Sequence, residues 1–151
     1  MPVPKIKQYL EQNQIKYKTI PHYSTPTAQE AAEAAHISGK HVAKTVVMRV
    51  NDGFALAVIP ASDVVNVEEL QDALGTHNVE VASESEFAHL FPECQTSALP
   101  PFGSLYGMEV FVSPHLRESE RIAVAAGYDD ELIELGYEDF ERLVGAAVLE
   151  F

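Results

Sequence analysis

A predicted β-hairpin between residues 38 and 60 constrains the fold of this chain more than any other feature. Its sequence, SGKHVAKTVVMRVNDGFALAVIP, contains two apolar runs, 44–50 and 54–60, on either side of Asn51-Asp52-Gly53. Asn, Asp and Gly tolerate the positive φ angles that tight hairpin turns require, so the tripeptide predicts the turn. We therefore expect an antiparallel pair of strands around which the other elements are organised.

The register of this hairpin determines what surrounds Lys44. A two-residue turn with Asp52-Gly53 at its tip pairs Lys44 with Ala61, Val46 with Ile59, and Met48 with Ala57. Side chains alternate along a strand, so Lys44 shares its face with Val46, Met48 and Val50. A lysine on an apolar face costs free energy to dehydrate unless an anion meets it. Two interpretations stay open: Lys44 reaches past the small Ala61 into a pocket, or its ammonium snorkels to water at the strand end.

The other predicted elements are short strands separated by single helices. Thr27, Asn66 and Ser83 each stand three residues before a glutamate, which is a helix-capping pattern. The periodicities predict helices over 4–13, 28–35, 67–75 and 138–144, and strands over 17–21, 79–82, 105–112, 121–125, 132–135 and 147–151. This order lacks the regular βαβ repeat of a doubly wound sheet, and no linker interrupts it. We expect an α+β fold in one domain, residues 1–151.

A proline-rich segment interrupts these elements. Residues 92–104, PECQTSALPPFGS, contain two adjacent prolines and a glycine, which suit neither a helix nor a strand interior. A rigid loop of this kind can present backbone N–H and C=O groups at fixed positions and so bind a polar ligand. The alternative interpretation is a structural loop that covers the sheet.

Composition excludes several classes of protein. Hydrophobic residues at 46% and charged residues at 22% are typical of a soluble globular domain. No apolar run approaches the roughly 20 residues that span a bilayer, and the N-terminal MPVPKIKQYLEQ lacks the features of a signal peptide. A single cysteine, Cys94, excludes an internal disulfide and fits a reducing compartment. We therefore expect a cytoplasmic protein with no membrane contact.

Charge is unevenly distributed along the chain. The formal net charge of −13 argues against general binding of duplex DNA, which requires clustered Lys and Arg. Residues 1–50 contain seven basic and three acidic residues, whereas residues 51–151 contain three arginines and twenty acids. A basic patch on an acidic body can dock one or two phosphates of a short anionic end. Alternatively, the acids simply keep the surface soluble.

Familiar catalytic signatures are absent. His36 and His41 are five residues apart, and no HxxxH or CxxC spacing occurs, so we expect neither a metal nor a cofactor. The chain has no GxGxxG, P-loop or GxSxG motif, and no signature of a nucleophile surrounds Cys94. Lys44 and the segment 97–103 remain as the candidate site.

Four sequence blocks occur in a recognisable order: TAQEAA from Thr27, AKTVV from Ala43, ALPPFG from Ala98 and AAG ending at Gly127. In order and spacing they resemble the YbaK family over residues 20–145. This family contains free-standing relatives of the editing domain of bacterial prolyl-tRNA synthetases. The resemblance implies a mixed sheet, partly curled into a barrel and flanked by helices, with a small pocket. It also implies hydrolysis of the ester that joins a wrongly attached amino acid to the terminal adenosine of a tRNA.

The resemblance assigns roles to particular residues. The strand lysine most tied to activity in the family maps onto Lys44, which would bind phosphate or ribose as a point charge. The loop around the substrate carbonyl and the AAG block map onto Ser97, Ala98, Leu99, Pro100, Pro101, Phe102, Gly103 and Gly127. The tRNA's own ribose hydroxyl helps to activate water in this family, so the protein mainly positions the substrate and stabilises charge. The implied partners are the aminoacyl-tRNA acceptor end and an aminoacyl-tRNA synthetase.

Two positions depart from the family pattern. Ser97 stands where a glycine usually begins the GxxxP loop, and serine adopts positive φ less readily than glycine. Tyr128 and Asp129 follow Gly127, where many relatives have a histidine. Our leading hypothesis is a trans-acting deacylase for small amino acids mischarged on tRNA. The alternative, favoured by Ser97, is a non-catalytic module of the same fold that binds a tRNA end or nucleotide, or regulates a partner.

Overall fold

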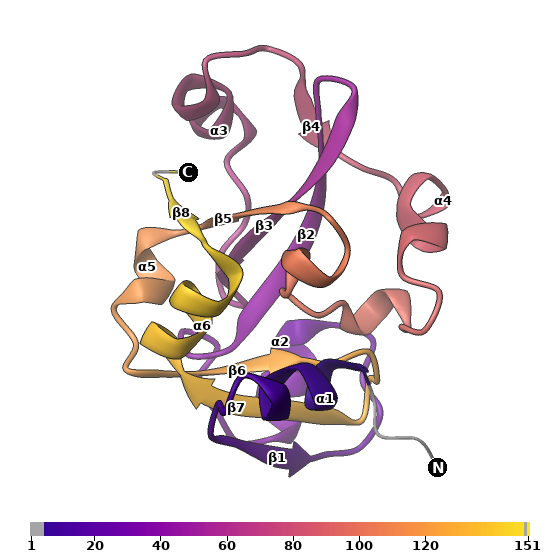
Figure 1. Ribbon diagram of the computed structural model, residues 1–151, viewed down its shortest axis with the longest axis vertical. Helices are drawn as coiled ribbons and strands as arrows, with labels where there is room; N and C mark the ends of the chain where they lie inside the picture. Colours follow the sequence, from indigo (N-terminus) through magenta and orange to yellow (C-terminus); the bar gives the residue numbers. More distant parts are fainter. Residues whose placement is uncertain (1–4, 150) are drawn as a thin grey trace.

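The computed structural model describes residues 5–149 and 151, and it places eight strands in two β-sheets (Figure 1). The larger sheet has the strand order β4-β2-β3-β5-β8, and the smaller has the order β1-β7-β6. In chain order the elements, with η for 3₁₀ helices, are α1 (Lys5–Gln12), β1 (Tyr17–Pro21), α2 (Ala28–Ala34), β2 (Ala43–Val50), β3 (Gly53–Pro60), α3 (Val67–Leu74), β4 (Val79–Val81), α4 (Glu84–Phe87), η1 (Ala88–Leu90), η2 (Thr96–Ala98), η3 (Gly103–Leu105), β5 (Glu109–Val112), α5 (Pro114–Arg117), β6 (Arg121–Ala125), β7 (Glu131–Gly136), α6 (Tyr137–Val144) and β8 (Ala147–Val148).

The two sheets confirm the predicted α+β class. The smaller sheet is antiparallel throughout, with β1 at one edge, whereas β3, β5 and β8 of the larger sheet run parallel. A parallel bridge between Val42 and Ala123 links the two sheets. Within the described residues the strands do not close into a complete barrel, so the fold is a mixed sheet that is only partly barrel-like.

The β2–β3 hairpin forms as predicted, but its predicted register is wrong by two residues. Lys44 pairs with Ile59, Val46 with Ala57 and Met48 with Ala55, instead of Ala61, Ile59 and Ala57. The turn residues are Asn51 and Asp52, because Asn51 adopts the left-handed φ of 53° and Gly53 already belongs to β3. Lys44 therefore lies opposite a large side chain.

Two other predictions need correction. The strand predicted over 105–112 begins only at Glu109, because η3 and a left-handed turn at Gly107 (φ 69°) precede it. The short helix α5 was not predicted; Ser113 caps it by accepting a hydrogen bond from the His115 N–H, and Pro114 occupies its first turn. Pro4 and Glu150, which the predicted first helix and last strand include, lie outside the described residues.

The predicted helix starts are confirmed by their caps. The side chains of Thr27 and Asn66 accept hydrogen bonds from the N–H groups of Glu30 and Glu69, and the Ser83 N–H donates to the Glu86 carboxylate. Within residues 5–149 and 151, every helix is too short or too polar to serve as a transmembrane segment.

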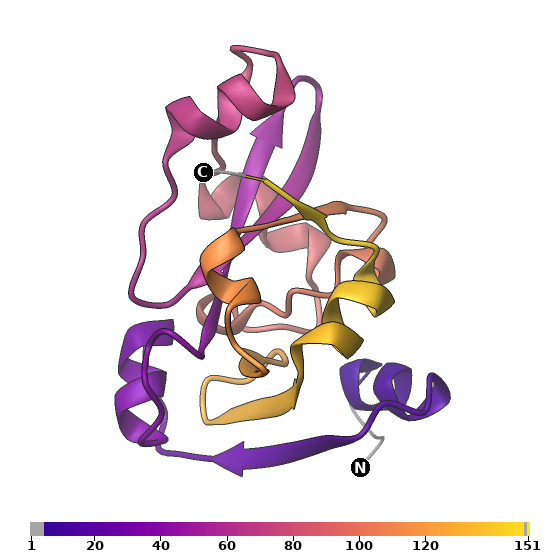
Figure 2. The same cartoon turned by 90° about the vertical axis from the view of Figure 1, so that its left-hand side faces the viewer.

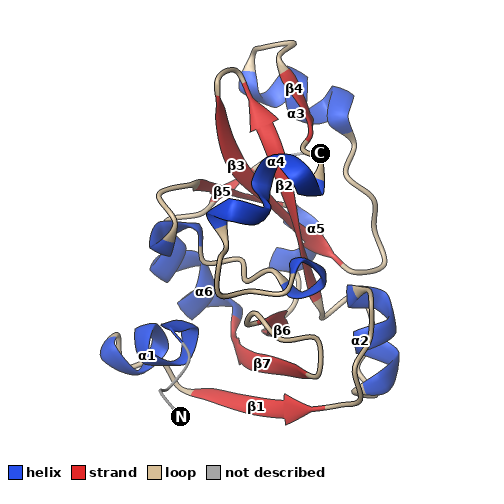
Figure 3. Cartoon of the chain, turned by 90° about the vertical axis from the view of Figure 1, so that its right-hand side faces the viewer, coloured by secondary structure: helices blue, strands red, loops and turns tan. Residues whose placement is uncertain are grey.

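Packing around the hairpin places Lys44 near the junction of the two sheets. The hairpin extends away from the small sheet, and α3 lies near its tip (Figures 1 and 2). Met48 is fully buried in one cluster with Leu70 of α3 and Phe111 of β5, so the predicted apolar face is indeed a core face. At the other end of the molecule, α1 and α2 lie at opposite ends of β1 (Figures 2 and 3).

Candidate functional site

A cavity of about 250 Å³ opens beside the start of β2. Four segments that are distant in sequence form its walls: the β1–α2 loop with the start of α2, the start of β2, the η2 segment, and the β6–β7 loop with the start of β7. The lining residues are His22, Thr25, Pro26, Thr27, Ala28, Ala31, Ala43, Lys44, Thr45, Thr96, Ser97, Ala98, Leu99, Ala125, Tyr128, Asp129, Glu131 and Leu132. The fold thus brings Lys44 together with the first half of the predicted loop.

Lys44 is held at the cavity wall by the loop that follows β3. Its ammonium donates a hydrogen bond to the Asp63 carbonyl oxygen over 2.7 Å, and the Asp63 carboxylate accepts one from His115 over 2.9 Å. Partial burial lowers the pKa of Lys44 below its usual value, and the Asp63 carboxylate partly opposes that shift. An ammonium has three N–H donors, so a positioned cation with two further donors is present in the wall.

The predicted loop 97–103 divides into two parts. Ser97, Ala98 and Leu99 line the cavity, whereas Pro100, Pro101, Phe102 and Gly103 are buried and do not line it. Phe102 packs edge-on against the rings of Tyr9 and Phe140. A Cβ on Gly103 would lie 2.5 Å from the Met108 carbonyl oxygen, so that site admits no side chain. The second half of the loop therefore anchors the first half in the core.

Gly127 supports the cavity from behind. Its N–H donates to the Ala98 carbonyl over 2.9 Å, and its carbonyl accepts from the Gln95 N–H over 2.8 Å. Its φ is +103°, and a Cβ there would lie 3.2 Å from the Cys94 sulfur. The backbone conformation and the limited space both favour glycine at this position. Burial raises the pKa of the Cys94 thiol, which disfavours the reactive thiolate.

Among the lining residues that were not predicted as site residues are His22, Tyr128 and Asp129. The His22 Nδ1 lies 2.6 Å from the Tyr23 carbonyl oxygen, which can only accept, so we infer that Nδ1 carries the hydrogen. Its Nε2 atom is buried and has no hydrogen-bond partner among the described residues. The change from the family's histidine to Tyr128 and Asp129 was the one available sequence signal, and none pointed to His22.

The carboxylates of the cavity differ in their pairing. Glu131 forms an ion pair with Lys7 at 3.1 Å. The Asp129 carboxylate forms no ion pair or hydrogen bond within the described part of the chain, although its backbone N–H donates to the Gln95 side chain over 2.7 Å. In residues 5–149 and 151, no group of three His, Cys, Asp or Glu side chains is arranged to hold a metal ion.

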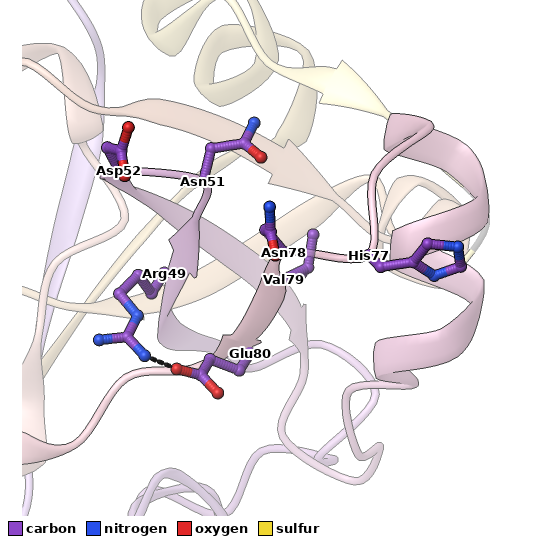
Figure 4. A pocket seen from close by; sticks show the side chains of 7 residues that line it. All are labelled: Arg49, Asn51, Asp52, His77, Asn78, Val79 and Glu80. Carbon is purple, nitrogen blue, oxygen red and sulfur yellow. Dashed lines mark ion pairs between the residues drawn. The ribbon is translucent and has the colours of Figure 1, made fainter.

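A second, larger hollow of about 850 Å³ lies at the hairpin tip (Figure 4). Its lining residues are Arg49, Asn51, Asp52, His77, Asn78, Val79 and Glu80. Figure 4 shows the Arg49 guanidinium directed at the Glu80 carboxylate, with which it forms an ion pair. Arg49 also pairs with Glu86 at 2.8 Å. This hollow contains none of the predicted site residues.

Solved structures share this fold. A candidate trans-editing enzyme for prolyl-tRNA synthetase superposes with a TM-score of 0.81 and 21% identity, covering 96% of this chain and 92% of that one. A protein described only as hypothetical superposes with a TM-score of 0.86 and 20% identity, covering 97% of each chain. A candidate signal transduction protein from Marinobacter aquaeolei VT8 superposes with a TM-score of 0.78 and 22% identity, covering 99% of this chain but 31% of that one. At these identities the similarity shows the fold alone.

Sequence comparison identifies the family. No curated protein matches the chain significantly. The family profile of the aminoacyl-tRNA editing domain matches residues 22–143, which include all four segments of the cavity that holds Lys44. Because this match spans most of the sequence, the chain belongs to the aminoacyl-tRNA editing domain family.

Proposed function

We propose that the protein is a trans-acting aminoacyl-tRNA deacylase that hydrolyses the ester of a small amino acid mischarged on tRNA. Family membership supports the editing role and the tRNA acceptor end as ligand. The observation that carries the finer proposal is the convergence of Lys44 and Ser97–Leu99 on one small cavity. The ester is expected to lie between them.

Charge in the cavity is complementary to an aminoacylated tRNA end. Such an end has a cationic α-ammonium next to the ester and an anionic phosphate one nucleoside away. The Lys44 ammonium provides a partly dehydrated cation for the phosphate or for negative charge that develops on the ester oxygen. The Asp129 carboxylate, which Lys7 does not neutralise as it does Glu131, provides the anion for the α-ammonium.

The size of the cavity favours a small side chain. At about 250 Å³ it falls below the range of roughly 300–1,000 Å³ that is usual for drug-sized ligands. Alanines form much of its wall: Ala28 and Ala31 lie one turn apart on α2, and Ala43 and Ala125 come from the strands. We therefore expect substrates in the alanine, cysteine, serine or threonine class, and poor hydrolysis of esters of large amino acids.

The reaction requires little covalent chemistry from the protein. Water adds to the ester carbonyl carbon, negative charge develops on the carbonyl oxygen, and the bond to the ribose oxygen then breaks. The proton that water loses goes to the departing ribose oxygen. The products are a free amino acid and an uncharged tRNA. Because the Ala98 N–H already donates to the Gln95 carbonyl, we assign charge stabilisation at this wall to Lys44.

Deacylation of a panel of mischarged tRNAs tests the proposal. The panel contains alanyl- and cysteinyl-tRNA for proline together with seryl- and threonyl-tRNAs, and the variants are Lys44→Ala and the matched control Lys40→Ala. Lys40 is exposed and does not line the cavity. We expect amino-acid release by the wild type and the control, and release that is slower on the order of 100-fold or more by Lys44→Ala. Binding of the tRNA end without release of any amino acid would replace the deacylase by the non-catalytic module.

A further inference from the structure

Tyr128 is an aromatic side chain at the edge of the Lys44 cavity that the proposed reaction does not yet use. It lines the cavity and is 43% exposed. Within the described residues its ring contacts no other aromatic ring. Tyr23 is still more exposed, at 72%, but does not line the cavity. A large ring face next to a ligand cavity is thus left open by the fold.

The backbone on both sides of Tyr128 is fixed. Gly127 exchanges hydrogen bonds with Gln95 and Ala98, and the Asp129 N–H donates to the Gln95 side chain. From the opposite side, the Thr25 N–H donates to the Asp129 carbonyl over 3.0 Å. The ring is therefore presented from a preorganised loop, and a ligand that covers it need not order that backbone first.

We propose that the Tyr128 ring is the stacking surface for the terminal base of the tRNA acceptor end. This inference rests on the proposed function. Single-stranded RNA ends are recognised largely by stacking of unpaired bases on aromatic rings. The terminal base and the ester are attached to the same ribose, so a base that stacks at the cavity edge directs its ester toward Lys44.

Local charge favours a base over a phosphate at this position. Asp129 and Asp130 follow Tyr128 directly, and two carboxylates oppose the approach of an anion. A base is uncharged, so it can approach the ring without this repulsion. The base is therefore the part of the terminal nucleotide that we place on Tyr128, while the ester extends into the cavity that Lys44 lines.

The test uses an RNA hairpin that ends in ACCA, with 2-aminopurine as its last base, because stacking quenches the fluorescence of this base. We expect wild type and Tyr128→Phe to bind the hairpin and quench its fluorescence. Tyr128→Ala should weaken binding about tenfold and abolish the quenching at saturation. Tyr23→Ala, which removes an equal but more exposed ring, should behave as wild type. Lys44→Ala should bind more weakly but still quench at saturation.

The outcomes separate this inference from the proposed function. Equal binding and quenching by wild type and Tyr128→Ala would overturn the stacking role, as would equal losses in Tyr23→Ala and Tyr128→Ala or no binding of the hairpin at all. If Lys44-dependent deacylation is unaffected in Tyr128→Ala, the deacylase stands and the stacking role falls. If quenching depends on Tyr128 but no tRNA in the panel is deacylated, stacking stands and the deacylase falls. Thermal unfolding of Tyr128→Ala should match that of wild type, because the ring is not in the core.

Discussion

The two hollows at opposite ends of β2 differ in a way that volume does not capture. In the hollow at the hairpin tip, about 850 Å³, two polar side chains are already paired: Arg49 forms ion pairs with Glu80 and Glu86, and Asn51 accepts a hydrogen bond from Thr76. The cavity at Lys44 has about 250 Å³, yet it contains a partly dehydrated ammonium and a buried His22 nitrogen that has no hydrogen-bond partner in the described part of the chain. The smaller space therefore combines a partly buried cation with a buried nitrogen whose hydrogen-bonding capacity is unused.

This difference supports the proposal that the Lys44 cavity is the one that binds a ligand. A buried polar atom without a partner, or a charge withdrawn from water, costs free energy that a folded chain tolerates where a ligand offsets it. Exposed ion pairs such as that of Arg49 contribute little and require no ligand. The comparison predicts that equivalent substitutions in the two hollows will have unequal effects.

The largest effect is expected from removing one cation from each hollow. Lys44→Ala should lower kcat/KM for deacylation on the order of 100-fold or more, because it removes a preorganised charge at the reacting ester. Arg49→Ala should leave kcat/KM within about twofold, since its charge is paired at the surface. Steady-state kinetics on one mischarged tRNA compares them. Similar losses of kcat/KM in both variants would show that the two hollows do not differ in function.

A second prediction concerns the pH at which the Lys44 cavity loses its cation. Burial lowers the pKa of Lys44, and the protonated form binds the substrate, so kcat/KM should fall as pH rises through that lowered pKa. The fall should begin below the usual lysine range near 10.4 and approach about tenfold for each further pH unit. Rates corrected for spontaneous ester hydrolysis, compared between wild type and Lys40→Ala, provide the measurement. If kcat/KM stays constant up to the ordinary lysine pKa, the charge of Lys44 is not needed for the reaction.

The local features of the fold were only partly predictable from the sequence. The caps at Thr27, Asn66 and Ser83 were predicted because each depends on a residue three positions away. The hairpin register was predicted incorrectly, because both Asn51 and Gly53 tolerate positive φ and the sequence does not determine which of them belongs to the turn.

Long-range contacts explain what was missed at the site. The alternation of side chains along β2 placed Lys44 on an apolar face, and the family resemblance implied its role. His22 and Asp129 become neighbours only because the β1–α2 loop meets the β6–β7 loop, through hydrogen bonds such as that from the Thr25 N–H to the Asp129 carbonyl. No local sequence pattern in either loop predicts that the two loops are in contact.

A third prediction compares two residues with positive φ: Gly127, which lies behind the Lys44 cavity, and Asn51, which lines the hollow at the hairpin tip. Gly127→Ala and Asn51→Ala both place alanine at a positive φ, which costs about 1–3 kcal/mol of folding free energy. Both should lower Tm by several degrees in thermal denaturation. Only Gly127→Ala should also lower kcat/KM, by several-fold, because its Cβ would crowd Cys94 and displace the segment that carries Ser97. An equal loss of activity in Asn51→Ala would show that general destabilisation, and not the local geometry of the cavity, is responsible.

The smallest effect is expected at Ser97, where the chain departs from its family. A glycine there would be needed if the backbone adopted a positive φ, but Ser97 lies within η2 and is not among the described residues with positive φ. Its side chain is exposed at the cavity, and the segment is already fixed by Gly127. Ser97→Gly should therefore change kcat/KM by less than about threefold and destabilise the fold by no more than about 1 kcal/mol through added backbone freedom. A large gain in activity would show instead that the serine side chain obstructs the ester. The family's glycine would then be a steric requirement and not a conformational one.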